Sequence, residues 1–225
     1  AKSKPNERAP LRAKEDGKFK IVQISDTDTW SQVSEYAKMP LIPMGRICQK
    51  ATLAHLCQSA LFKVVAPIIE RSTPFAAVFG YHDCEGIHAL TSSAHIILQN
   101  LTFNLSESGP EQVDGISNFY LQVLAPAPSQ LPLSTLYFLD SHGQMQSKVH
   151  SPDYDPIKQS QIDWFTNTSQ AQRRAREKNN NNNSSFHQSL AFLHIPLPEF
   201  KDCHISIGNG DRREPTESPS INSHF

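Results

Sequence analysis

A short apolar run at residues 75–79 leads directly into the turn Gly80-Tyr81-His82-Asp83. A continuous apolar run of this length, bounded by turn residues, is typical of a strand that is covered on both faces of a sheet. Such a strand delivers the polar side chains that follow it to one edge of the sheet. The run therefore predicts a layered core, and it marks His82 and Asp83 as candidate functional residues.

Three further predicted strands also end at a polar side chain: residues 19–25 before Asp26, residues 136–139 before Asp140, and residues 189–193 before His194. The other predicted elements are a strand at 119–124, a linker at 125–132, and helices at 60–71, 87–98 and 157–178. This order of elements predicts an α/β domain built in layers. In open α/β sheets, functional sites gather outside the carboxyl ends of the strands.

Composition excludes several classes of protein. The chain has 225 residues, which suffices for one sizeable domain or for a clipped larger one. Its formal net charge of −1 gives no overall attraction to nucleic acid or to anionic membranes, so we expect no nucleic-acid partner. No apolar run approaches the roughly 18 residues of a membrane span. The four cysteines form no CxxC pair, which argues against a structural zinc knuckle. A cytoplasmic and a secretory location both stay open.

The candidate segments resemble one known superfamily when they are taken in order. Residues 18–26 resemble the first strand and metal-binding aspartate of the calcineurin-like metallophosphoesterases, a superfamily that includes the purple acid phosphatases. Residues 78–83 resemble their Gly-Asn-His-Asp/Glu motif, and residues 189–198 resemble the segment with a lone histidine. Tyr-Phe-Leu-Asp-Ser-His at 137–142 and Gln-Ser-Gln-Ile-Asp-Trp-Phe at 159–165 resemble the subgroup related to purple acid phosphatases.

The resemblance implies a fold, which is a layered β-sandwich flanked by helices and incomplete in this chain. The implied domain covers residues 18–225, after a disordered tail at residues 1–17. Within it, residues 28–59 are atypical, and residues 179–185 form a low-complexity asparagine and serine loop. The final Gly-His-x-His motif of the family is missing.

The resemblance also implies a chemistry, the hydrolysis of phosphate esters by a metal-activated water. The implied cofactors are two divalent or trivalent metal ions of the iron, zinc or manganese type. By resemblance, Asp26, Asp28 and His194 are metal ligands. His82 protonates the leaving oxygen, and Asp83 orients His82. The implied substrate is a phosphate ester, either a small molecule or a phosphoprotein.

Departures from the family pattern imply an impaired enzyme. Asp28 stands where the family has the histidine of its Asp-x-His motif, and Tyr81 stands where an asparagine binds metal. No Gly-Asp lies between Asp26 and Gly80 to supply the bridging carboxylate. The alternative interpretation is therefore a catalytically inactive remnant that acts as a binding or regulatory module, or that has no function.

Each candidate residue also has a structural interpretation. Asp26 fits a turn cap after its strand, and His82 fits a hydrogen-bonded loop histidine. His194 fits a structural role in its proline-rich surroundings. Asp140 and His142 fit the lining of a cleft as well as a solvated loop. The remaining histidines lack ligand spacing and are interpreted as surface or packing residues: His55, His88, His95, His150, His187, His204 and His224.

The segment after Thr27 has an explanation at the level of DNA. Codons compatible with residues 28–40 can be read from the third base of the Asp28 codon. They then encode His-Met-Val-Thr-Gly-Leu-Arg-Val-Cys-Lys-Asp-Ala. This phase restores Asp-Thr-His and a stretch that resembles the family's own. We hypothesise that residues 28–40 are a frame-shifted form of the ancestral motif, produced by decay of the gene or by a misplaced splice junction.

Sequencing of the genomic DNA around codons 26–60 tests this hypothesis. We expect the codons for residues 28–40 to be compatible with the alternative reading throughout, because a recent shift of phase leaves the nucleotides themselves in place. Codons that cannot encode the restored motif in that phase would remove the hypothesis.

Overall fold

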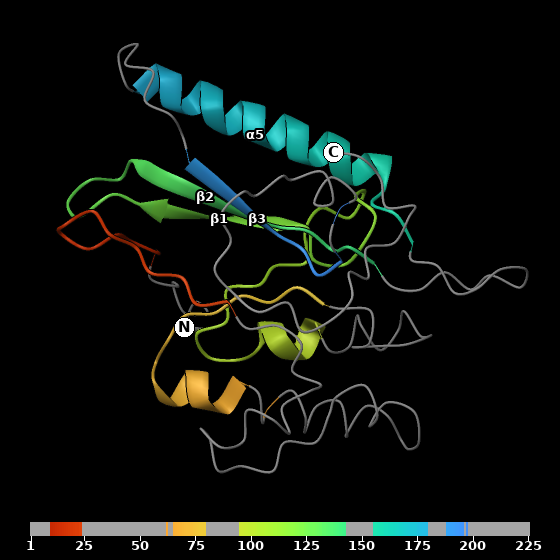
Figure 1. The fold of residues 1–225 in the computed structure, drawn as a ribbon, viewed down its shortest axis with the longest axis horizontal. Coiled ribbons are helices and arrows are strands. Elements are labelled where there is room, and N and C mark those ends of the chain that lie inside the picture. Colours follow the sequence, from red (N-terminus) through yellow and green to blue (C-terminus); the bar gives the residue numbers. More distant parts are fainter. Residues whose placement is uncertain are drawn as a thin grey trace, which may run out of the picture.

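The computed structural model describes residues 10–23, 62, 65–79, 95–142, 155–179, 188–195 and 197. Within them the chain forms strand β1 (Phe119–Leu124), strand β2 (Pro132–Phe138), helix α5 (Gln159–Asn179) and strand β3 (Gln188–Phe192). Short helical segments lie at 65–70 and 95–99. Figure 1 shows α5 above the sheet and the two short helical segments below it.

The three strands form one mixed sheet in the order β1-β2-β3. β1 runs antiparallel to β2, with Phe119 opposite Phe138, and β2 runs parallel to β3, with Phe138 opposite Phe192. Helix α5 is the crossover that a parallel pair of strands requires. The carboxyl ends of β2 and β3 therefore lie at the same edge. This mixed α/β arrangement agrees with the predicted class, and the second sheet of a β-sandwich stays a prediction.

One face of the sheet is apolar and is built around stacked aromatic rings. The rings of Phe119 and Phe138 lie 4.6 Å apart, and those of Phe138 and Phe192 lie 5.2 Å apart, measured between centroids. Val123 and Leu136 complete the buried part of this cluster. Stacked aromatic pairs of this kind contribute about 0.5–1.5 kcal/mol beyond the burial of their area. The cluster therefore joins all three strands.

Residues 75–79 lie between two apolar clusters. Ala76 and Val78 pack against the sheet cluster, whereas Phe75 and Phe79 pack against the cluster formed by the two short helical segments. This alternation is that of an extended chain covered on both faces, as predicted. The strand predicted at residues 75–79 was wrong. Among the described residues, this segment pairs only through an isolated bridge at Phe75. An apolar run indicates that a segment is covered, but it does not determine whether the segment pairs with another strand.

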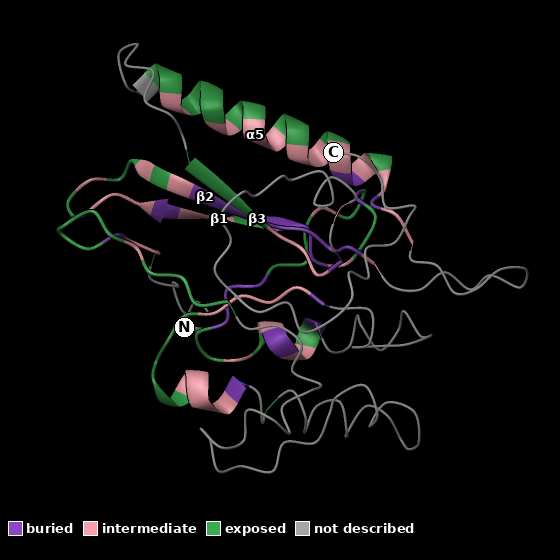
Figure 2. Cartoon of the chain, in the orientation of Figure 1, coloured by how far each residue is buried: buried purple, intermediate pink, exposed green. Residues whose placement is uncertain are grey.

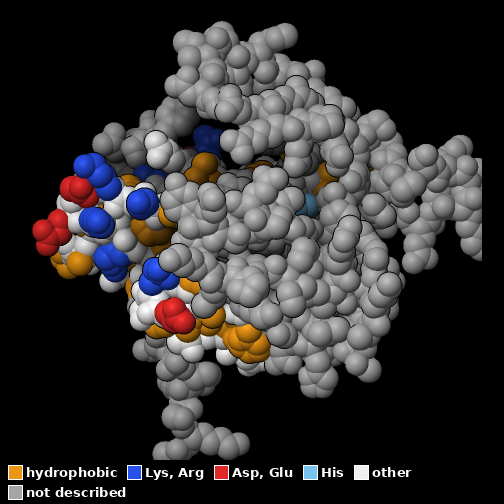
Figure 3. Space-filling model, turned by 60° about the horizontal axis from the view of Figure 1, so that its bottom comes forward, with side chains coloured by type: hydrophobic (Ala, Val, Ile, Leu, Met, Phe, Trp, Pro, Cys, Tyr) orange, Lys and Arg blue, Asp and Glu red, His pale blue; other side chains and the backbone are white. Residues whose placement is uncertain are grey.

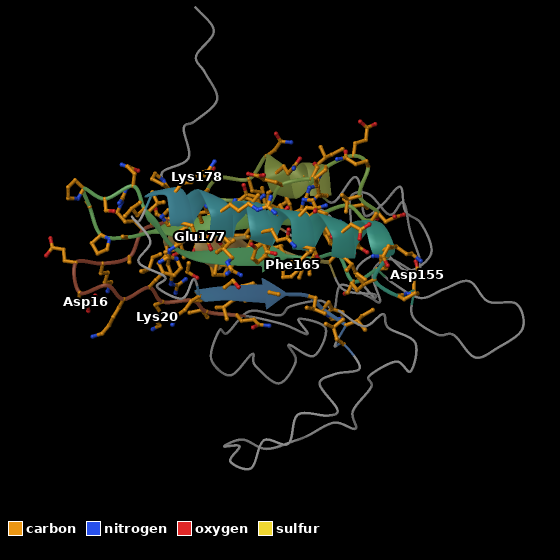
Figure 4. The ribbon with its side chains drawn as sticks, turned by 90° about the horizontal axis from the view of Figure 1, so that it is seen from above. Asp16, Lys20, Asp155, Phe165, Glu177 and Lys178 are labelled. Carbon is orange, nitrogen blue, oxygen red and sulfur yellow. The ribbon has the colours of Figure 1, made fainter. Side chains whose placement is uncertain are left out.

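Helix α5 covers the opposite face of the sheet. The ring of Phe165 meets the ring of Tyr137 edge-on, with centroids 4.8 Å apart. The side chain of Gln122 on β1 donates a hydrogen bond to Gln172 on α5. Figure 2 shows that the outer side of α5 is exposed and the side toward the sheet is half-buried or buried. In Figure 4, Phe165 lies over the sheet, between Asp155 near the start of α5 and Lys178 near its end.

The predicted boundaries need small corrections. β1 has the predicted bounds. β2 begins at Pro132 and ends at Phe138, so the linker is shorter than predicted and Asp140 lies beyond the strand. β3 ends at Phe192, before His194. The first half of β2 was not predicted as a strand, because it contains the polar residues Ser134 and Thr135. Both nevertheless pair with β1. Among the described residues, no helix has the length and apolar character to cross a membrane.

The N-terminal segment lies against the end of β1. Arg12 forms an isolated bridge with Leu124, and the main-chain N–H of Ala13 donates to the Leu124 carbonyl at 2.9 Å. The carbonyl of Leu11 accepts the main-chain N–H of Leu124 at 2.9 Å, so three residues of the segment expected as a loose tail are held in place. Residues 19–23 have no strand pairing within the described part of the chain, so the strand predicted there is not observed over these residues. Lysine, arginine and acidic side chains are mixed on the described part of this end of the molecule (Figure 3).

Candidate functional site

His194 is the predicted site residue that falls within the described part of the chain. It is half-buried and follows the carboxyl end of β3. Asp26, Asp28, His82 and Asp83 lie outside the described residues. Their convergence with His194 therefore stays a prediction.

His194 lines a pocket of about 520 Å³ beside strand β3, together with residues 190–193, Ile21 and Gln23. The segment that leads toward Asp26 therefore passes beside the strand that leads to His194. A pocket of this size is large enough for a small ligand.

The ends of β2 and β3 are joined beyond the strands themselves. The main-chain N–H of Leu139 donates to the Phe192 carbonyl at 3.0 Å. The main-chain N–H of Ile195 donates to the Ser141 hydroxyl at 3.0 Å, and this hydrogen bond is buried. The segments after the two strands are thereby fixed side by side.

Asp140 is buried at this strand end and braces two loops. Its Oδ2 accepts the main-chain N–H of Ile116 at 2.9 Å, and its Oδ1 accepts that of His142 at 2.9 Å. Gly115 lies so close that an added Cβ would come within 2.9 Å of the Asp140 side chain, and its φ of 89° also favours glycine. Asp140 is 7% exposed, so the solvated-loop interpretation was wrong for this residue.

Gln161 lies at the centre of a buried polar network. Its Nε2 donates to Asn118 Oδ1 at 2.8 Å and to the Asp140 carbonyl at 2.7 Å. Its Oε1 accepts the main-chain N–H of Lys158 at 2.9 Å and lies 2.7 Å from His142 Nε2. The hydrogen-bonding capacity of this amide is fully used, as a completely buried amide requires.

Apolar periodicity did not reveal Gln161, because that pattern marks only apolar positions on the buried side of a helix. Part of a helix-capping signal was present in the sequence. Gln161 is the third residue of α5, where a Gln side chain reaches back to the N-cap N–H, here that of Lys158. Lys158 stands where the full capping box has Ser or Thr, so the sequence carries only the second half of that signature. The links of Gln161 to Asn118 and Asp140 depend on the tertiary fold.

His95 is a buried histidine near this network. It is 2% exposed, and its ring meets Phe79 edge-on at 6.0 Å. Neither ring nitrogen has a hydrogen-bond partner among the described residues. Burial lowers the pKa of His95 below its ordinary value of 6.5, and the charge of Asp140 opposes that shift. Of the two interpretations from sequence, packing rather than surface is the correct one.

The described residues contain no group of three His, Cys, Asp or Glu side chains able to hold a metal ion. His194 offers an imidazole, a ligand that suits zinc and iron. The carboxylate of Asp140 is occupied by main-chain N–H groups. A complete metal site at this strand end therefore needs ligands from other parts of the chain.

Comparison with known proteins identifies the relatives of this chain. Probable inactive purple acid phosphatase 14 of Arabidopsis thaliana is 29% identical over 259 residues, which cover 97% of this chain and 63% of that protein. Phosphatase DCR2 of Saccharomyces cerevisiae is 29% identical over 95% of this chain and 42% of its own length. Probable inactive purple acid phosphatase 29 of A. thaliana is 35% identical over 71% of this chain and 43% of its own length.

The chain is a relative of the purple acid phosphatases, within the metallophosphoesterase superfamily. This confirms the family predicted from the ordered motifs. The chain spans less than two thirds of the length of each of these three relatives. No family model and no solved structure matches it.

Removal of the buried amide tests the polar network of this phosphatase relative. We expect Gln161→Ala to lower the free energy of unfolding by about 3 kcal/mol, because it orphans several buried polar groups at once. Urea unfolding followed by circular dichroism measures the change. Gln172→Ala is the matched control on the same helix and should cost about 0.5–1 kcal/mol. If both variants lost the same free energy of unfolding, the central position of Gln161 in the network would be contradicted.

The pH dependence of stability tests the environment of His95. Its folded-state pKa lies below the unfolded value, so its contribution to stability is complete above about pH 6.5. As the pH falls below that value the unfolded state binds the proton first, and stability is lost by at most about 1.4 kcal/mol per pH unit.

We expect His95→Leu to reduce this loss between pH 6.5 and 5 and to raise stability at pH 7, because leucine leaves no buried polar atom unpaired. Thermal unfolding across the pH range measures both effects. An unchanged slope in the variant would mean that His95 is solvated in the folded protein.

Proposed function

We propose that the chain is a metal-dependent phosphoesterase, impaired relative to its family, that hydrolyses phosphate esters. The observation that carries the proposal is the similarity over 95% of the chain to a protein named as a phosphatase. The position of His194 after β3, beside the segment that leads toward Asp26, supports it further. The substrate is a phosphate ester, either a small molecule or a phosphoprotein.

The roles in this proposal are assigned by residue. In this family, bound metal ions supply charge for the phosphate oxygens and an activated water. Asp26 and His194 hold the ions, and Asp28 contributes a carboxylate where the family has a histidine. His82 holds the proton for the leaving oxygen, and Asp83 orients the His82 ring. The metals are of the iron, zinc or manganese type.

The alternative is a catalytically inactive relative that acts as a binding or regulatory module, or that has no function. Two observations favour this alternative. Three of the relatives carry the words "probable inactive" in their names. In addition, Tyr81 replaces the family's metal-binding asparagine, and the bridging Gly-Asp motif is absent.

Metal content and phosphatase activity together distinguish the two. We expect the purified chain to bind about two metal ions, measured by plasma mass spectrometry, and to hydrolyse a generic aryl phosphate slowly. His82→Ala should lower kcat by about 10²–10⁴-fold and leave the metal content unchanged, because His82 acts on the proton. His88→Ala is the matched histidine control and should have no effect.

Each remaining outcome has a defined meaning. A chain without metal and without turnover supports the inactive alternative. Turnover that survives both His82→Ala and Asp26→Ala would contradict the proposed site.

A further inference from the structure

Two neighbouring segments of the chain match Asn-x-Ser/Thr, the acceptor sequence for N-linked glycans. They are Asn100-Leu101-Thr102 and Asn104-Leu105-Ser106. The sequence alone does not distinguish the two, because a motif of this length recurs by chance. Both lie within the described residues, directly after the helical segment at 95–99. Their burial and their hydrogen bonds therefore decide which of them has the chemistry of an acceptor.

The second motif is enclosed in the fold. Asn104 and Ser106 are each 1% exposed. Asn104 Nδ2 donates to the Leu98 carbonyl at 2.6 Å, and Asn104 Oδ1 accepts the Ser106 hydroxyl at 2.9 Å. The same hydroxyl oxygen accepts the main-chain N–H of Ala77 at 2.9 Å. A sugar on Asn104 would displace these contacts and leave buried polar atoms without partners. This motif is therefore a structural brace.

The first motif lies on the surface. Asn100 and Thr102 are both exposed. Leu101 between them packs against the apolar cluster below, and its main-chain N–H donates to the Leu98 carbonyl at 3.0 Å. Asn100 Nδ2 donates to the Ile96 carbonyl at 2.8 Å, and this hydrogen bond is exposed. A side-chain amide has two N–H groups, and glycosylation replaces one of them, so the other remains for a hydrogen bond.

The turn at 100–103 also gives a glycan a fixed base and an apolar surface to cover. The Phe103 carbonyl accepts the main-chain N–H of Phe75 at 3.0 Å, which ties the turn to the covered segment at 75–79. Exposed apolar side chains lie on both sides of Asn100 along the chain, at Ile96 and Phe103. A glycan is bulky and hydrophilic, so at this position it would shield these side chains from contact with other molecules.

We propose that Asn100 is an acceptor for an N-linked glycan and that Asn104 is not. The donor is an oligosaccharide joined to a lipid through a diphosphate. The bond from sugar C1 to the diphosphate oxygen breaks, and Asn100 Nδ2 forms the new bond to C1. One Nδ2 proton is released, and the lipid diphosphate leaves with the electron pair of the broken bond. The modification belongs to the chain within a secretory compartment, and it is independent of the proposed phosphatase chemistry.

Secretion of the whole chain from a eukaryotic cell, behind a cleavable leader, tests this assignment. The secreted, folded fraction is treated with an N-glycosidase in ¹⁸O water, which converts each glycosylated asparagine to a labelled aspartate. Peptide mass spectrometry then locates the label. We expect the label at Asn100 and none at Asn104, together with a loss of apparent mass on electrophoresis that corresponds to a single glycan.

Paired variants check the same assignment by electrophoresis. Asn100→Gln and Thr102→Ala each destroy the exposed motif, and both should abolish the loss of apparent mass on enzyme treatment. Ser106→Ala is the matched control, because it destroys the buried motif and should leave that loss unchanged.

The unchanged chain decides the question if a variant fails to fold. A labelled Asn104, or an unlabelled Asn100, in the secreted chain would overturn the proposal.

Discussion

The buried side-chain amide of Gln161 is the contact that fixes α5 to the end of the sheet. It caps the helix through Lys158, holds Asn118 in the loop before β1, and donates to the carbonyl of Asp140 after β2. A buried amide is stable here only if each of its donors and acceptors has a hydrogen-bond partner. Each buried group left without a partner lowers stability by about 1–3 kcal/mol. The network therefore specifies one placement of the helix.

That placement determines where the candidate site lies. Because α5 connects two parallel neighbours, β2 and β3 end at one edge, and their following segments are joined through Ser141 and Ile195. His142 and His194 are thereby carried on a braced part of the molecule. Catalytic and metal sites need such rigid support, since small displacements of a ligand weaken binding strongly.

The sequence predicted the elements that have a strong local signal. β1 has its predicted bounds, and α5 and β3 differ by two residues or fewer at each described end. Local pattern failed where pairing depends on distant parts of the chain. Residues 75–79 are half-buried to buried, and their pairing within the described residues is one isolated bridge at Phe75. The polar first half of β2, in contrast, is a strand. Of the site, the sequence predicted His194 at a strand end, but an apolar period cannot reveal the polar contacts of Gln161.

Nuclear magnetic resonance of the Gln161 side chain tests the central contact most directly. We predict slow hydrogen exchange of its two Nε2 protons and a scalar coupling across the hydrogen bond from Nε2 to the carbonyl carbon of Asp140. Exchange at the rate of a free amide, with no such coupling, would contradict the account, because the first turn of α5 would then not be held to the segment after β2.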